Sequence, residues 1–270
     1  MTKLQQQPLP AEWADTPVTV VMPTYNECGS LPGTAEEVLA LPLPGLQLMV
    51  VDDSSPDGTG ELAEKLATQA NEESTADGRP RMRVLHRTAK DGLGRAYAAG
   101  MATAVEEGAR YVVQMDADGS HPAEAVPRML GTALSSQAGL VVGSRYVPGG
   151  ELAEEWGWHR RLLSRWANAY AGTILSTRIR DITAGFNLWD AEALRAIGLG
   201  RLESAGYSFQ VELKFRAVQA GWTAVEIPIR FAERHTGESK MSLAVQLESA
   251  IVPWRLRLRA ARRGSGDTAR

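Results

Sequence analysis

Residues 46–69, with the sequence LQLMVVDDSSPDGTGELAEKLATQ, contain a strand, a loop and a helix in succession. Residues 46–51 are a continuous apolar run of the kind that forms a buried strand, and Asp52-Asp53 closes it. After a loop with Pro56, residues 58–69 predict a helix, because apolar residues recur there at helical spacing: Leu62, Ala63, Leu66 and Ala67. A strand that leads directly into a helix is half of a βαβ unit.

The same alternation extends through the first half of the chain. Strands are predicted at residues 18–22, where Pro23 ends the run, and at 82–85, 111–115 and 140–142. Helices are predicted at 29–41, 94–107 and 124–134, with a polar loop at 70–80. Strands that alternate with helices predict an α/β fold with a mostly parallel central sheet and helices on both faces.

The pattern is less regular after residue 150. We expect helices at 160–175 and 207–220, a Gly-containing stretch at 181–189 and a strand at 223–231. A long C-terminal helix is expected at 241–263.

The composition is that of an ordinary globular protein. Of the 270 residues, 44% are hydrophobic and 23% charged, which excludes a disordered chain. The single cysteine, Cys28, excludes a disulfide framework or a cysteine-based zinc site. The sequence has no run of 18 apolar residues and no apolar signal core at its start, so we expect a cytoplasmic protein. The near-neutral charge balance argues against a nucleic-acid partner.

Charge is unevenly distributed along the chain. Residues 1–150 carry 11 basic and 19 acidic side chains, whereas residues 151–270 carry 18 basic and 13 acidic ones. The net charge of −3 therefore hides an acidic first half and a basic second half. A cation-binding front and an anion-binding back would produce this distribution.

The residues at the strand ends are the candidates for function, because ligands of open α/β sheets bind beyond the carboxyl ends of the strands. Asp116 and Asp118 follow the apolar run at 111–115. Carboxylates at the end of a buried strand are costly without a positive partner, and oxygen ligands favour Mg²⁺ or Mn²⁺. A polar loop with helix-capping aspartates is the alternative explanation of this D-x-D pattern.

Two other interpretations apply to these loops. Asp53, Ser55, Asp57 and Gly58 match the spacing of a calcium-binding loop, but a strand leads into them and Pro56 interrupts them. The run from Asp116 to Ser120 also resembles the nucleophile loop of haloacid-dehalogenase-like phosphatases. That family places the loop on its first strand, whereas here the loop ends the fourth.

Taken together, the strand-end motifs resemble the inverting family 2 glycosyltransferases of the GT-A fold. The motifs are Pro23-Thr24-Tyr25-Asn26-Glu27, residues 51–59 (VDDSSPDGT), Gly92-Leu93-Gly94, Asp116-Ala117-Asp118 and Gly143-Ser144-Arg145-Tyr146. Each motif alone is of modest specificity. The presence of all five in this order at strand ends makes the resemblance strong.

Motifs of the second half narrow the resemblance to polyprenol-phosphate (dolichol-phosphate) mannosyltransferases. They are Trp156-x3-Arg160-x3-Ser164-x3-Asn168, Asp181-x-Thr183-x-Gly185-Phe186, residues 206–210 (GYSFQ) and residues 237–240 (GESK). The resemblance implies transfer of mannose from GDP-mannose to a polyprenyl phosphate, with inversion and with Mg²⁺ or Mn²⁺. Three alternatives are a glycosyltransferase that uses UDP-glucose or a similar donor, a phosphatase built on Asp116, and a catalytically silent nucleotide-sugar-binding subunit.

The resemblance also implies a domain division and roles for individual residues. Residues 1–16 would be a flexible N-terminus, and 17–245 the catalytic domain, with a donor half (17–150) and an acceptor half (151–245). Residues 246–270 would be a basic amphipathic C-terminal helix and tail. The implied catalytic residues are Asp116, Asp118 and Arg145. The implied ligands are, for the donor, Pro23, Tyr25, Glu27, Val51, Asp53, Ala117, Arg234 and Lys240; for the acceptor phosphate, Arg145, Arg160 and Ser164; and for the metal, Asp116, Asp118 and Ser120.

The residues suit a sugar transfer between two phosphates. A phosphate monoester has a second pKa of about 6, so the acceptor is anionic near neutral pH and needs positioning more than a general base. Arginine suits this task because its guanidinium binds phosphate bidentately and stays charged. The four histidines (86, 121, 159 and 235) are scattered and are interpreted as surface or capping residues.

The end of the chain predicts contact with a membrane, which a polyprenyl acceptor also requires. Residues 254–270 contain six arginines and one acid, and residues 243–258 add apolar surface. This combination is typical of a helix that lies on an anionic bilayer. We expect peripheral attachment at the cytoplasmic face, through the lipid surface or a separate membrane-anchoring subunit. A helix packed on the protein body with a solvated basic end is the alternative.

Overall fold

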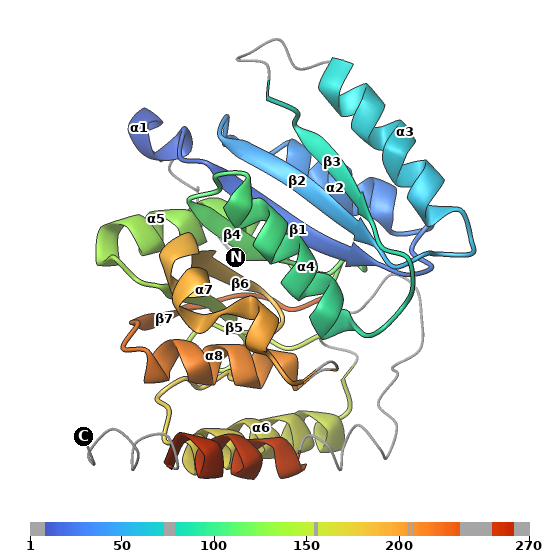
Figure 1. Cartoon of the computed structure of the whole chain (residues 1–270). Helices are drawn as coiled ribbons and strands as arrows, with labels where there is room; N and C mark the ends of the chain where they lie inside the picture. Colours follow the sequence, from blue (N-terminus) through green and yellow to red (C-terminus); the bar gives the residue numbers. More distant parts are fainter. Residues whose placement is uncertain are drawn as a thin grey trace, which may run out of the picture.

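The residues that the computed structural model describes (9–72, 79–153, 156–204, 206, 208–232 and 250–261) contain one seven-stranded sheet (Figure 1). Its order is β3-β2-β1-β4-β6-β5-β7. The bounds are β1 Val18–Thr24, β2 Leu46–Asp52, β3 Met82–His86, β4 Tyr111–Gln114, β5 Leu140–Ser144, β6 Asn187–Asp190 and β7 Ala224–Pro228.

The sheet is mostly parallel, as predicted. Strand β6 alone runs against its neighbours, pairing antiparallel with both β4 and β5, while the other pairs are parallel. The chain moves from β1 outward to β2 and β3 and then returns to the other side of β1 at β4. This return makes β1 and β4 the switch point at which an open α/β sheet forms its ligand crevice.

Helices cover both faces of the sheet. Helices α2 (Leu31–Leu39), α3 (Thr59–Glu72) and α5 (Val126–Ser136) contribute to one hydrophobic cluster. Helices α4 (Leu93–Glu106), α6 (Trp158–Leu175), α7 (Ala191–Ile197) and α8 (Phe209–Gln219) contribute to the other. Val20 and Val21 of β1 face opposite clusters, as the two-residue period of a strand requires. A sheet buried on both faces explains the continuous apolar strand sequences.

Some elements differ from the sequence prediction. Strand β1 continues through Pro23, because β4 pairs only with residues 18–21 and requires no N–H group from Pro23. Strand β6 lies largely in the stretch at 181–189, for which no strand was predicted. Helix α7 lies where the sequence predicted no element. Helix α3 extends to Glu72 and so includes the first three residues of the loop predicted at 70–80.

The two ends of the chain are described in part. Residues 1–8 lie outside the described residues, and the expected flexible N-terminus differs at Ala11–Ala14, which form the short helix α1. The backbone oxygen of Ala14 accepts from Gly45 N–H, which ties this segment to the start of β2. Of the long helix expected at 241–263, residues 250–261 are helical, and the rest lies outside the described residues.

The helix over 250–261 lies beside α6 at the lower edge of the molecule (Figure 1). Tyr170 OH donates to the backbone oxygen of Ala250 at 2.9 Å, and Arg257 Nη1 donates to Ser176 Oγ at 2.6 Å. None of the described helices has the length and apolarity needed to cross a bilayer.

Candidate functional site

The loops after β1 and β2 are held together by side chains at the carboxyl edge of the sheet. The buried Asp52 accepts from Thr24 Oγ1 at 3.1 Å and from Ser55 Oγ at 2.6 Å. Ser55 Oγ in turn accepts from the backbone N–H of Asn26, a residue in the left-handed region with φ of 61°. The two loops therefore form one fixed wall of the crevice.

Asp53 and Tyr25, two predicted donor residues, each meet a cation on this wall. Asp53 is buried and forms an ion pair with Arg87, which also pairs with Asp91. Burial raises the pKa of Asp53, although Arg87 opposes the shift. The ring of Tyr25 lies 3.5 Å below the Lys90 ammonium. These two pairings leave this wall of the crevice less acidic than its sequence indicates.

The other predicted donor residues occupy different places. Glu27 lies in the loop after β1 and accepts from Ser30 Oγ at 2.6 Å. Pro23 lies inside β1, and the backbone oxygen of Ala117 accepts from Thr34 Oγ1 at 3.1 Å. The fully buried Val51 is directed at α4, where a Cβ on Gly100 would lie 2.6 Å from it, so the structure does not bring its side chain to the crevice wall.

Asp116 and Asp118 follow β4 at the switch point, and neutral groups of the protein hold both carboxylates. Tyr97 OH donates to Asp116 Oδ1 at 2.5 Å. Ser120 donates to Asp118 Oδ1 from its hydroxyl at 2.6 Å and from its backbone N–H at 3.1 Å. Neutral donors of this kind orient a carboxylate without cancelling its charge.

This donor set fits a divalent metal. Hard cations such as Mg²⁺ and Mn²⁺ prefer oxygen ligands and often take only one or two protein carboxylates. Asp116 and Asp118 would supply these, and the bound metal would stabilise charge on a diphosphate leaving group. Ser120, the third predicted ligand, is almost fully buried and positions Asp118. Its role as a metal ligand stays a prediction.

Tyr97 and His121 are site residues that the sequence analysis missed. Tyr97 of α4 is fully buried, and burial together with Asp116 raises the pKa of its phenol well above the usual value, so the group stays a donor. His121 was interpreted as a surface or capping residue, but its ring is buried and stacks on Phe186 at 5.1 Å. His121 Nδ1 accepts from the backbone N–H of Asp116 at 3.0 Å.

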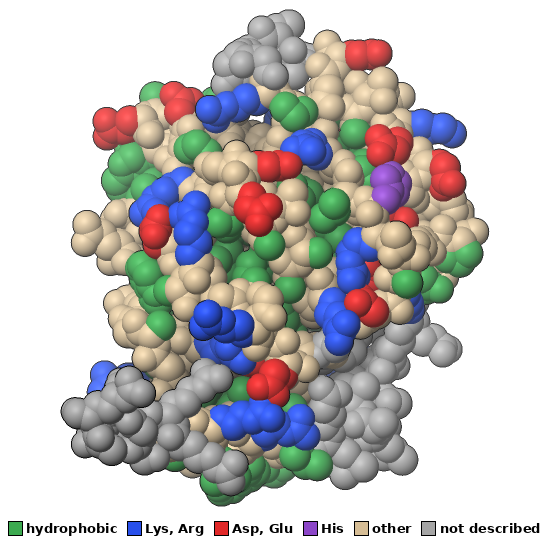
Figure 2. All heavy atoms as spheres, in the orientation of Figure 1, with side chains coloured by type: hydrophobic (Ala, Val, Ile, Leu, Met, Phe, Trp, Pro, Cys, Tyr) green, Lys and Arg blue, Asp and Glu red, His purple; other side chains and the backbone are tan. Residues whose placement is uncertain are grey.

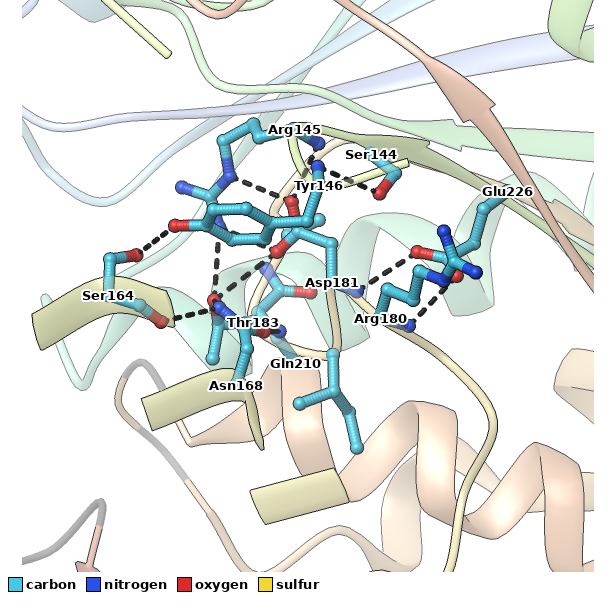
Figure 3. Close-up of polar contacts among 12 residues, drawn as sticks. Ser144, Arg145, Tyr146, Ser164, Asn168, Arg180, Asp181, Thr183, Gln210 and Glu226 are labelled. Atoms are coloured by element: carbon cyan, nitrogen blue, oxygen red, sulfur yellow. Dashed lines mark hydrogen bonds and ion pairs between the residues drawn. The ribbon is translucent and has the colours of Figure 1, made fainter. Parts of the chain in front are cut away.

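Arg145, the predicted acceptor and catalytic residue, forms a buried ion pair with Asp181 (Figure 3). Its Nε and Nη2 donate to the two Asp181 oxygens at 2.8 and 2.7 Å, and Nη2 also donates to Thr183 Oγ1. The Arg145 pair holds the pKa of Asp181 below its usual value against strong desolvation. These contacts use Nε and Nη2 and fix the orientation of the guanidinium.

Helix α6 presents the other predicted acceptor residues. Ser164 Oγ accepts from Tyr146 OH at 2.6 Å, and the buried Asn168 donates to Thr183 Oγ1 at 3.0 Å (Figure 3). Asn168 Oδ1 also accepts from Thr183 N–H, so α6 and the loop with Asp181 are joined on both sides of Asn168. Arg160 is exposed and stacks on the Trp156 ring at 3.9 Å.

The loop over residues 181–185 connects the two groups of predicted residues. At one end, Asp181 and Thr183 hold Arg145. At the other end, a Cβ on Gly185 would lie 3.4 Å from the His121 ring and 3.7 Å from Asp116 Oδ2. Phe231 also lies between the groups, 5.8 Å from the His121 ring and 5.4 Å from the Arg145 guanidinium carbon. The carboxylates and Arg145 therefore form one site.

Lys214 is a further residue that the sequence analysis missed. It lies on α8, is fully buried, and its ammonium donates to the backbone oxygens of Ile182 at 3.2 Å and Ala184 at 2.5 Å. Desolvation lowers its pKa to about 7, opposed by the nearby Asp181. These hydrogen bonds to the residues before and after Thr183 hold the 181–185 loop in place.

Arg234 and Lys240, the donor residues predicted on a closing loop, lie outside the described residues, as does the motif at 237–240. Ala232 is the last described residue before them, and its N–H donates to the backbone oxygen of Ser120 at 3.1 Å.

The chain belongs to glycosyl transferase family 2, whose profile matches residues 19–198. It is 45% identical to the undecaprenyl-phosphate mannosyltransferase of Micrococcus luteus over 234 residues, 87% of this chain and 91% of the relative. It is also 45% identical to the polyprenol monophosphomannose synthase of Mycolicibacterium smegmatis over 223 residues, 83% of this chain and 80% of the relative.

Solved structures share the fold at low sequence identity. Glucosyl-3-phosphoglycerate synthase from Mycobacterium tuberculosis, in complex with Mn²⁺, UDP-glucose and phosphoglyceric acid, matches with a TM-score of 0.61 at 18% identity, covering 90% of this chain and 82% of that one. A mannosyltransferase from Pyrobaculum calidifontis, in complex with GDP-mannose and Mn²⁺, matches with a TM-score of 0.55 at 15% identity, covering 93% and 75%. These matches confirm the predicted GT-A type of fold.

Family membership and geometry remove two of the alternative interpretations. The loop from Asp116 to Ser120 belongs to a glycosyltransferase and not to a phosphatase. The calcium-like spacing has another use, because Asp57 accepts from Thr59 and from Cys28 N–H at the start of α3 while Asp53 pairs with Arg87.

Proposed function

We propose that this chain transfers mannose from GDP-mannose to a polyprenyl phosphate with inversion, forming a polyprenyl-phosphate mannose as a lipid-linked sugar donor for glycolipid and cell-envelope synthesis. The observation that carries the proposal is the 181–185 loop, which holds Arg145 through Asp181 and lies next to the carboxylate of Asp116 at Gly185. Two relatives at 45% identity are named for mannose transfer to, or synthesis of, polyprenol-linked products, which supports the acceptor class.

The residues divide the reaction between them. The loops with Tyr25 and Asp53 would hold the nucleotide, and Arg234 and Lys240 would contact the donor phosphates. Mg²⁺ or Mn²⁺ on Asp116 and Asp118 would stabilise the charge on the nucleoside diphosphate as it leaves. Arg145, Arg160 and Ser164 would hold the acceptor phosphate so that its oxygen attacks the anomeric carbon from the opposite side. Positioning of two anions against their repulsion would be the main contribution of the protein.

We propose further that the enzyme works attached to the cytoplasmic face of a membrane, directly or through a separate anchoring subunit. The support is an apolar outer face on α6 and the 250–261 helix, with side chains that are about half exposed or more: Trp158, Leu162, Leu163, Trp166, Ile251, Trp254 and Leu258. Hydrophobic side chains reach the surface along the lower edge of the molecule, where these helices lie (Figure 2). An anionic cytoplasmic leaflet would attract the arginines around this face.

The test is a transfer assay with labelled GDP-mannose and a polyprenyl phosphate in detergent. We expect label in the organic-extractable lipid, loss of transfer with a chelator, and recovery with Mg²⁺ or Mn²⁺. Transfer from UDP-glucose alone would replace the proposed donor, and donor binding without turnover would indicate a silent subunit.

Arg160→Ala tests the acceptor assignment. Because Arg160 is an exposed charge at the acceptor side, we expect the KM for polyprenyl phosphate to rise about 10-fold with little change in the KM for GDP-mannose. Arg201→Ala, another exposed arginine, is the control. An equal effect of both variants on the acceptor KM would contradict the assignment.

A further inference from the structure

A basic hollow lies on the flank of α6, next to the acceptor residues. Its volume is about 570 Å³, within the usual range for ligand pockets. Arg165 of α6 lines it together with Ser176, Thr177, Arg178 and Arg180 from the turn after this helix. Tyr146 forms the wall shared with the acceptor residues.

The arginine side chains of this basic hollow form no ion pair with a carboxylate of the described residues. Within the described part of the chain, no carboxylate forms an ion pair with the side chains of Arg165, Arg178 or Arg180. The nearby Glu226 accepts from the backbone N–H groups of Arg180 and Asp181 instead. Three guanidinium groups around one hollow, without an ion-pair partner among the described residues, favour an anionic ligand, because each can bind a phosphate through two parallel hydrogen bonds.

A hydroxyl in the same hollow points to a ligand independently. The Thr177 Oγ1 atom is buried and has no hydrogen-bond partner among the described residues. A buried hydroxyl without a partner loses free energy, so such groups usually have one. An anion with several acceptor oxygens would satisfy the hydroxyl and the arginines together.

The position of the hollow identifies the source of this anion. Trp158 and Trp166, exposed by 77% and 58%, lie on the α6 surface that we propose to face the membrane. Arg165 lies between that surface and the buried side of α6, at 340° around the helix when Trp158 is set at 0° and Trp166 at 80°, taking about 100° per residue. Arg257 of the 250–261 helix reaches the rim by its hydrogen bond to Ser176. The rim therefore lies at the depth of lipid headgroups when the apolar residues enter a bilayer.

We propose that the basic hollow binds the phosphate diester of an anionic phospholipid headgroup. The choice of a phospholipid rests on the proposed membrane attachment, whereas the preference for an anion rests on the arginines and Thr177 alone. The bound headgroup would anchor α6 at a fixed depth and angle. This anchoring would hold Ser164 and Asn168, on the same helix, in position for a lipid-borne acceptor.

The test is flotation of the full chain with vesicles of phosphatidylcholine alone or with 30 mol% phosphatidylglycerol, as about one lipid in three. Basic residues at an anionic surface each strengthen binding about fivefold. The triple variant Arg165→Gln/Arg178→Gln/Arg180→Gln should lose about 100-fold of the preference for anionic vesicles. A matched triple, Arg83→Gln/Arg195→Gln/Arg201→Gln, removes the same charge from other exposed positions and should change the preference less than about threefold.

A second variant separates a phosphate site from general surface charge. Arg165→Lys/Arg178→Lys/Arg180→Lys keeps the charge but lacks the guanidinium fork, so we expect about a 10-fold loss of the preference. Thermal unfolding and transfer in detergent micelles should stay at the wild-type level in all three variants. Failure of transfer in the wild type would contradict the proposed function without affecting these binding results.

Three results would overturn the proposal. The glutamine triple could match its charge control, or the lysine triple could keep the full preference for anionic vesicles. Inorganic phosphate could also raise the thermal midpoint of the wild type but not of the glutamine triple, without any preference for anionic vesicles. That last result would assign the hollow to a soluble phosphate.

Discussion

The donor side and the acceptor side of the site hold their charged groups in opposite ways. On the donor side, Asp116 accepts a hydrogen bond from Tyr97 and Asp118 accepts one from Ser120, and both of these donors are neutral groups. On the acceptor side, Arg145 is paired with the buried Asp181. Asp181 offsets the charge of Arg145 and fixes the orientation of its guanidinium group. The acidic motif is therefore supported by neutral hydrogen-bond donors, whereas the basic motif is supported by a buried carboxylate.

Loss of a donor-side carboxylate should have the largest effect. Asp118→Ala removes a proposed metal ligand together with its charge, so we expect kcat to fall about 10³-fold, the order seen for loss of a key electrostatic group. The measurement is transfer at saturating donor over a range of Mn²⁺ concentrations. Asp91→Asn, at an exposed acid paired with Arg87, is the control and should stay within about threefold. Wild-type turnover of Asp118→Ala would contradict the proposal that Asp118 is a metal ligand.

On the acceptor side, the corresponding change should affect folding first. Asp181→Asn leaves Arg145 buried without its counter-charge, so we expect a loss of about 3–5 kcal/mol in the free energy of unfolding. Asp190→Asn is the matched control, because Asp190 is also buried but pairs with the half-exposed Arg110 and caps α7. Because asparagine caps a helix as well as aspartate does, only the ion pair is lost, and the expected cost is at most about 1 kcal/mol. Urea unfolding measures the free energy of unfolding of both variants. Equal losses would show that the buried Asp181–Arg145 pair stabilises the fold no more than the Asp190–Arg110 pair does.

The sequence was sufficient to predict the strands whose side chains are buried on both faces. It did not predict β6, because Asn187–Asp190 has only four residues and begins and ends with a polar one. Asn187 is tolerated in the core because it donates to Gln114 Oε1 and to the backbone oxygen of Ala184. Gln114 is distant from Asn187 in the sequence, so no local pattern reveals this partner.

The candidate site shows the same limit. Motifs at strand ends identified Asp116, Asp118 and Arg145, because each follows an apolar strand. Tyr97 and Lys214 could not be found in this way, since each lies on an amphipathic or buried helix and acts through a contact formed only on folding. Val51 shows the converse limit: its motif was recognised, but the motif did not reveal that the strand period directs this side chain into the core.

On the acceptor side, Lys214 should make the free energy of unfolding depend on pH. Its pKa is about 7 in the folded chain, among Asp181, Arg145 and Glu226, whereas an unfolded lysine holds its proton to about pH 10.4. Between these values the unfolded chain binds more protons, so stability should rise with pH by roughly 1 kcal/mol per unit above pH 7.

The variant Lys214→Met should lack this rise, and thermal unfolding from pH 6 to 9 measures the difference. It should also raise the KM for the acceptor, because the loop that holds Arg145 loses two hydrogen bonds. Leu213→Ala, a cavity variant on the same helix, should be less stable at every pH but keep the wild-type slope. An unchanged slope in Lys214→Met would mean that the lysine does not titrate in this range.

The smallest effect is expected from removing one neutral donor on the donor side. Tyr97→Phe keeps the ring that stacks on Phe209 but removes the hydroxyl that donates to Asp116. Loss of such a partner to a metal ligand should weaken the apparent affinity for Mn²⁺ about 10-fold. Tyr111→Phe is the control, because Tyr111 begins β4, the strand that leads to Asp116, but lies at its opposite end. Since the pKa of Tyr97 is raised well above the usual tyrosine value, wild-type metal binding should show no tyrosine titration up to about pH 10. If Tyr97→Phe bound Mn²⁺ as tightly as Tyr111→Phe, neutral donors would not be what keeps the donor carboxylates in place.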